Sequence, residues 1–166
     1  MITYFAPAVA ALTLLYAWVL WSQVRRQQGG TPAMEAVASA IRLGANAFLR
    51  RQYRTILVLA VLVAAAIVLA YGLGDGETGW RIGLQVGGAF MLGAVLSAIA
   101  GAVSMVVAVR ANVRTARAAS HGLNAALTTP LKAGTVSGIT IVALSVLGVA
   151  ALLLFYQVLG VDVARI

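Results

Sequence analysis

Basic side chains recur at helical spacing in the second half of the chain, and the chemistry they offer is the attraction of anions. They are Arg110, Arg114, Arg117 and His121. Steps of three and four residues return to one side of a helix, so these groups would form a basic stripe whose field draws a polyanion such as a phosphate compound. Membrane topology and contact with lipid headgroups explain the same stripe without any ligand, and this simpler interpretation is favoured. His121 and the nearby Asn112 have no partner visible in the sequence, so neither is assigned a catalytic role.

The acidic residues are too few and too scattered to support catalysis. They are Glu35, Asp75, Glu77 and Asp162. Hydrolysis of phosphate compounds on magnesium ions takes several carboxylates, and ion transport through a helical bundle typically uses a carboxylate inside the membrane. No long apolar segment contains an acidic residue. Of the four, only Glu35 lies in a connection between apolar segments that is rich in arginine. We therefore assign no catalytic, cofactor-binding or metal-binding residue, and we expect the chain alone to be inactive as an enzyme.

The elements that must hold these groups are four long apolar segments without a charged residue. They cover residues 2–21, 55–73, 82–109 and 133–159. A helix needs about 20 apolar residues to cross the roughly 30 Å of hydrocarbon in a bilayer, and each segment is near or above that length. Hydrophobic residues make up 62% of the 166 and charged residues 10%, and the segments lack the alternation of barrel strands. The prediction is an all-α membrane protein with four transmembrane helices that form a single unit over residues 1–166.

Basic residues also orient the predicted helices. Ten of the twelve Lys and Arg follow the first or the third segment: Arg25, Arg26, Arg42, Arg50, Arg51, Arg54, Arg110, Arg114, Arg117 and Lys132. These two connections are therefore expected in the cytoplasm and both termini outside, in a multi-pass protein of a prokaryotic plasma membrane. Topology accounts for the net charge of +8, so the expected partner is the lipid bilayer and not a nucleic acid. The first segment lacks a basic start and precedes Arg25 and Arg26, which favours a retained helix over a cleaved signal peptide.

The first cytoplasmic connection contains a predicted amphipathic helix. Thr31 can cap its N-terminus, Pro32 suits its first position, and Glu35 suits its first turn. Apolar residues then fall on one face: Met34, Val37, Ala38, Ile41, Ala45 and Phe48. The helix is expected to run into the second segment. It would lie on the membrane surface or dock against the cytoplasmic ends of neighbouring helices.

Stripes of small residues predict where the helices pack. In the third segment Ala89, Gly93, Ser97 and Gly101 recur at every fourth residue, and in the fourth a comparable stripe begins with Gly134 and Gly138 and is followed by Ser145 and Gly148. Such faces let helix backbones approach closely in lipid. Aromatic residues are expected at the membrane boundaries, with Tyr4, Tyr71, Trp80 and Tyr156 outside and Trp18, Trp21 and Tyr53 inside.

Several segments together resemble one family of membrane enzymes. They are residues 34–53, 93–105, 107–119, 122–127 and 132–138, with Ala-Asn-Val-Arg-Thr-Ala at 111–116 as the most specific part. The chain resembles the N-terminal portion of the membrane-bound inorganic pyrophosphatases that translocate protons or sodium ions. The resemblance covers nearly the whole chain. It departs from the family at Pro130, just before the fourth segment, and at Lys132, where the family often has arginine.

The resemblance implies a structural role. The family's pumps arrange their helices in an inner and an outer ring and work as homodimers, and this chain is similar to the first four helices, which belong to the outer ring. The pyrophosphate site, its aspartate-rich magnesium-binding segments and the ion gate lie on inner-ring helices. The family therefore implies Mg²⁺ as cofactor and the remaining helices as partners, with no ligand for the metal on this chain. The chain would be a truncated product or a fragment whose remainder is encoded separately.

Two other functions are weighed against this one. A stand-alone membrane scaffold or interaction protein, derived from the pump but no longer part of one, fits the same sequence. An independent small transporter fits less well, because its path would be expected to contain an intramembrane charge.

Overall fold

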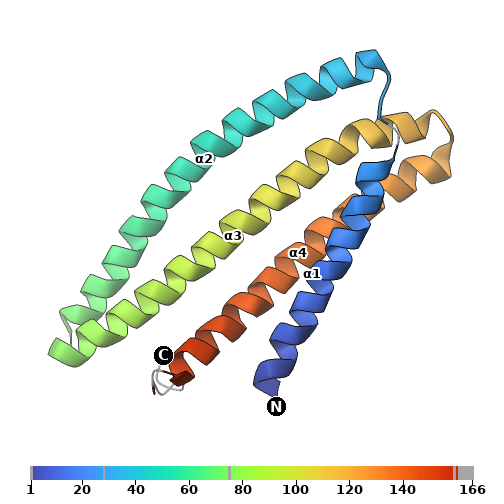
Figure 1. Ribbon diagram of the computed structural model, residues 1–166. Helices are drawn as coiled ribbons and strands as arrows, with labels where there is room; N and C mark the ends of the chain where they lie inside the picture. Colours follow the sequence, from blue (N-terminus) through green and yellow to red (C-terminus); the bar gives the residue numbers. More distant parts are fainter. Residues whose placement is uncertain (1, 28, 75, 159, 161–166) are drawn as a thin grey trace.

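In the part of the chain that it describes, the structure, a computed structural model, consists of four long helices (Figure 1). It describes all residues except 1, 28, 75, 159 and 161–166, so Asp75 and Asp162 lie outside the described residues. The helices are α1 (Ile2–Arg26), α2 (Pro32–Gly72), α3 (Gly76–Ala119) and α4 (Leu123–Val158). Each is long and apolar enough to cross a membrane. The predicted all-α membrane fold with four spans is confirmed, whereas its orientation stays a prediction.

The helices form an open row in the order α2, α3, α4, α1 (Figure 1). Helix α1 packs mainly on α4, with a smaller contact to α3, and over the described residues it does not pack on α2. Only 11% of the most apolar stretch of α3 is buried, and 22% of that of α4. Most of each membrane-spanning surface is therefore left to lipid or to other helices.

The predicted amphipathic segment and the second span are one continuous helix, α2. The Thr31 hydroxyl accepts a hydrogen bond from the Met34 N–H at 3.4 Å, which makes Thr31 the N-cap that the sequence predicts. Ala38 is buried, and the chain at Gly30 lies against Val113 of α3. This end of α2 thus docks along a neighbouring helix. The predicted apolar face is only partly covered, because Val37, Ile41 and Phe48 remain exposed.

Loss of this cap gives a first testable prediction. Thr31→Ala should lower the free energy of unfolding by about 1 kcal/mol, because it removes the acceptor for one N–H of the first turn. Titration with a denaturing detergent, followed by far-ultraviolet circular dichroism, would measure the change. Ser39→Ala is the matched control, since the Ser39 hydroxyl is exposed and bonds only the Ala36 carbonyl of its own helix. Equal losses in the two variants would contradict the assigned role of Thr31.

Helix α4 begins ten residues before the predicted fourth span and continues through Pro130. Helix α3 runs to Ala119, and Gly122 has a φ of 126°, in the region that favours glycine. The inner connection, where the chain departs from the family at Pro130 and Lys132, is therefore a tight turn between two helical extensions.

Helices α2 and α3 pack closely at glycines that the sequence analysis did not single out. A Cβ atom on Gly83 would lie 2.9 Å from the Val68 carbonyl oxygen of α2, and one on Gly87 would lie 2.9 Å from Val68 Cγ2. Gly79, Gly83 and Gly87 are all buried. Of the predicted small residues, Gly148 packs against Leu96 and Gly101 against the Tyr53 hydroxyl, but Gly93, Gly134 and Gly138 face open space.

Two tyrosines expected at the membrane boundaries are hydrogen-bonded to α3. The Tyr53 hydroxyl donates to the Ala98 carbonyl at 2.7 Å, and the Tyr156 hydroxyl donates to the Gln85 carbonyl. These bonds tie α2 and α4 to α3. A buried apolar cluster joins α1, α3 and α4 near their basic ends, through Leu20, Val24, Val107, Ala111, Ala133 and Val136.

Candidate functional site

The main concentration of charge lies where α1 and α3 end and α2 and α4 begin (Figure 1). The predicted basic stripe on α3 divides between two grooves there. Arg114, Arg117 and His121 line an open groove of about 590 Å³ between α1, α3 and α4. Arg110 lines a smaller one, of about 80 Å³, together with Arg42 of α2. Because α3 is flanked on both sides, its stripe does not form one continuous basic surface.

Arg114 is held in place by backbone carbonyls. Its guanidinium donates to the Arg110 carbonyl at 2.7 Å and to the Arg25 carbonyl at 3.2 Å. The second bond fastens α3 to the end of α1. The Nε atom is buried and has no hydrogen-bond partner within the described part of the chain.

The surroundings of Arg114 are strongly cationic. Burial lowers the pKa of Arg114 below its ordinary value; Glu35 acts in the opposite direction, and Arg110, Arg42 and Arg25 lower the pKa further. Arginine nevertheless stays protonated at neutral pH. The cluster therefore brings several positive charges together around a single carboxylate.

That carboxylate is already paired. Glu35 accepts from Arg42 at 2.8 Å, and its other oxygen accepts from the Gly30 N–H at 3.3 Å. The Arg42 and Glu35 side chains are 42% and 41% exposed, so the ion pair contributes at most about 1 kcal/mol. Its effect is mainly to fix the first turn of α2 and the chain before it.

Polar side chains complete the wall of the larger groove, which we call the basic groove. Thr129 donates to Gln27 at 3.1 Å and so connects the start of α4 to the end of α1. Lys132 donates to Gln23 at 3.3 Å one turn further along the same pair of helices. Gln27, Asn124, Thr128 and Thr129 line the basic groove beside its two arginines and His121.

The residues at this end do not fit a magnesium ion, the cofactor that the resemblance implies. Magnesium takes oxygen ligands and is usually held by carboxylates. Here Glu35 is bonded to Arg42 and faces further arginines. Over residues 2–27, 29–74, 76–158 and 160, no three His, Cys, Asp or Glu side chains come together. We therefore derive no catalytic step through a metal on this chain.

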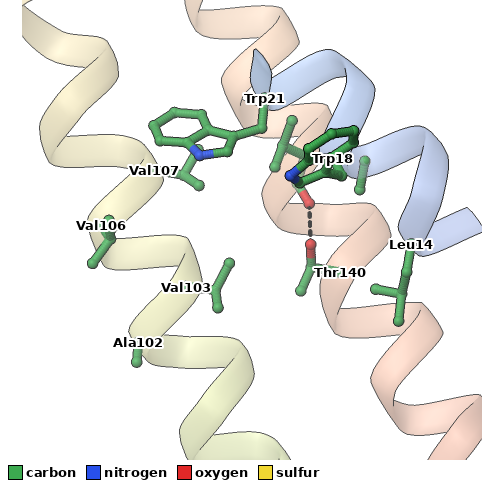
Figure 2. Close-up of a pocket in the computed structure, with 10 residues that line it drawn as sticks. Leu14, Trp18, Trp21, Ala102, Val103, Val106, Val107 and Thr140 are labelled. Carbon is green, nitrogen blue, oxygen red and sulfur yellow. Dashed lines mark hydrogen bonds between the residues drawn. The ribbon is translucent and has the colours of Figure 1, made fainter. Parts of the chain in front are cut away.

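A separate apolar pocket of about 390 Å³ lies within the membrane-spanning part, between α1, α3 and α4. Figure 2 shows Trp21 beside Val107, with Trp18 on the same helix and Thr140 on α4. The Thr140 hydroxyl donates to the Val136 carbonyl at 2.7 Å, so its polar group is satisfied within α4 (Figure 2). The pocket offers shape and apolar contact, but no group suited to acid–base or metal chemistry.

These features together define a multi-pass, α-helical integral membrane protein with one strongly basic end. Residues 11–165 match the profile of the family described as inorganic H⁺ pyrophosphatase, so the chain belongs to that family. The resemblance noted in the sequence is thereby confirmed.

Curated relatives agree with the family assignment. A K⁺-insensitive pyrophosphate-energized proton pump of Caldanaerobacter subterraneus is 42% identical over 160 residues, a match that covers 89% of this chain and 22% of the relative. A protein of the same name from Methanosarcina mazei is 34% identical, with 91% and 21% covered. Pyrophosphate-energized membrane proton pump 3 of Arabidopsis thaliana is 36% identical, with 95% and 21% covered. The chain thus spans about a fifth of the length of these relatives.

Proposed function

We propose that this chain forms an outer-ring, N-terminal segment of a membrane pyrophosphatase that couples pyrophosphate hydrolysis to proton or sodium transport. The segment supplies no catalytic group. Its role is to pack against the helices that carry the active site. Family membership, together with a length about a fifth of that of the relatives, supports this proposal.

One structural observation carries the proposal: the row of helices is open, and a groove of about 400 Å³ runs between α3 and α4. Gly93, Ser97, Gly101 and Ser145 line it and are exposed. Small residues are what close helix packing in lipid requires, since apolar burial alone gives no preference for protein over acyl chains. We assign this groove, here called the α3–α4 groove, to contact with the remaining helices.

The other parts of the proposal follow from the same assignment. Magnesium would be bound by carboxylates on the remaining helices, and the complete pump would be a homodimer. The basic residues would lie in the cytoplasm and both termini outside, as expected in a prokaryotic plasma membrane. The basic end would support the approach of magnesium pyrophosphate from the cytoplasm by its electrostatic field.

Complementation tests this function. The chain would be co-expressed with the Caldanaerobacter relative from which the matching fifth has been deleted, and pyrophosphate hydrolysis would be measured in membranes. Each part alone should be inactive, and the two together should hydrolyse pyrophosphate. Inactivity of the pair, with both parts inserted and the deleted relative rescued by its own missing segment, would contradict the proposal and favour a stand-alone scaffold. Hydrolysis by the isolated chain would contradict its non-catalytic role.

A further inference from the structure

The basic groove has an excess of positive charge that the described residues do not balance. Arg114 and Arg117 line it together, and none of the described residues that line it is acidic. Like charges gathered in a partly buried place repel one another more than they would in water. An anion in the basic groove would relieve that repulsion.

The basic groove also presents donors that are free to bind. The Arg117 side chain lines it and makes no hydrogen bond or ion pair within the described ranges. Arg114 is fixed by two carbonyls, so it loses little conformational entropy when an anion approaches. The Asn124 amide adds a neutral donor on the α4 side, whereas the Thr128 hydroxyl is already bonded to the Asn124 carbonyl. Fixed guanidinium groups with a neighbouring amide donor are well suited to binding a phosphate.

The depth of the basic groove indicates where such a phosphate comes from. The first apolar segment, residues 2–21, measures about 30 Å at 1.5 Å per helical residue and so matches the thickness of the hydrocarbon. Its last residue, Trp21, lies beside Val107 of α3 (Figure 2). The Arg114 guanidinium bonds the Arg110 carbonyl, three residues past Val107, which places it about 5 Å beyond that level. The headgroup layer extends roughly 5–8 Å beyond the hydrocarbon on each side. The inner end of the basic groove therefore lies at the level of lipid phosphates.

We propose that the basic groove is a binding site for the phosphate of an anionic phospholipid headgroup, held by Arg114 and Arg117. The site is a defined groove and differs from the diffuse attraction that any basic membrane surface exerts. It stands on the geometry of α1, α3 and α4 alone, so it does not depend on whether the chain belongs to a complete pump.

Lipid retention measured by native mass spectrometry tests the site. The purified chain in detergent would be given equal amounts of phosphatidylglycerol and phosphatidylcholine. The unchanged chain should retain phosphatidylglycerol preferentially, and R114Q/R117Q should bind it about tenfold more weakly, as expected for the loss of charged hydrogen bonds. The matched control R50Q/R51Q removes the same charge from two exposed arginines that do not line the basic groove, and should bind as the unchanged chain does.

A milder variant and a comparison with free phosphate separate loss of the site from loss of the fold. Because R114Q/R117Q removes the link to α1, R117Q alone serves as the milder variant, and it should still weaken binding several-fold with unchanged helicity. Inorganic phosphate, added to the chain in phosphatidylcholine nanodiscs, should not raise the unfolding temperature, whereas added phosphatidylglycerol should. Equal stabilisation by free phosphate would overturn the lipid assignment. Equal losses in R50Q/R51Q and R114Q/R117Q, or no preference for phosphatidylglycerol at all, would overturn the site itself.

Discussion

Replacement of Gly83 by leucine is expected to separate α2 from α3 and to lower the free energy of unfolding by about 2–3 kcal/mol. Even the first added carbon would lie 2.9 Å from the Val68 carbonyl oxygen and 3.1 Å from the Val68 Cα atom. Both are backbone atoms, so no side-chain rotation can make room, and α2 must move. That movement would also strain the hydrogen bond from Tyr53 to Ala98 on the same pair of helices.

The matched control for this change is Gly93→Leu, on the same helix. A Cβ atom on Gly93 would meet no atom within 4 Å, and leucine favours a helix over glycine by roughly 0.5–1 kcal/mol. The isolated chain should therefore tolerate Gly93→Leu or gain slightly in stability. Detergent unfolding of the two variants, followed by circular dichroism, would measure the difference. Similar stabilities would show that α2 and α3 do not approach each other closely at Gly83.

The contrast between these glycines shows how far the sequence predicts the fold. Apolar length determined the four spans, and hydrogen-bonding chemistry determined the cap at Thr31, because both depend on residues close together in the chain. Gly83 and Gly93 have the same local signal, a glycine at four-residue spacing in an apolar helix. Which of them meets another helix depends on the neighbours of α3, and spacing along one helix does not contain that information.

The basic groove was predictable to a similar extent. The spacing of Arg114, Arg117 and His121 correctly placed them together on α3. Gln27 and Thr129 were missed, because they are 102 positions apart and meet only when α1 packs beside α4. The separation of Arg110 from the basic groove was missed for a related reason, since it depends on α2 docking along the other side of α3. The run of Gly79, Gly83 and Gly87 was an unused signal that α2 packs on α3, at the end of α3 opposite Arg110.

The second large effect is expected in the complete assembly and again concerns Gly93. In the complemented pump, Gly93→Leu should reduce pyrophosphate hydrolysis more than tenfold, although the same change leaves the isolated chain folded. The physical reason is that leucine would fill the α3–α4 groove, which we propose is occupied by the remaining helices. Insertion of a bulky side chain into a packed helix interface typically costs about 1–3 kcal/mol, which weakens the association of the two parts roughly 5- to 150-fold.

Ala66→Leu provides the comparison, because Ala66 is an exposed small residue in the apolar part of α2, outside the α3–α4 groove. It adds a bulky side chain to the surface of the row without narrowing that groove. Co-purification of the two parts, measured together with hydrolysis, separates a failure to assemble from a failure to turn over. If Gly93→Leu assembles and hydrolyses as well as Ala66→Leu does, the α3–α4 groove faces lipid in the pump. The contact with the remaining helices would then lie on another side of the row, such as the Trp18 and Trp21 side of α1, where the apolar pocket opens.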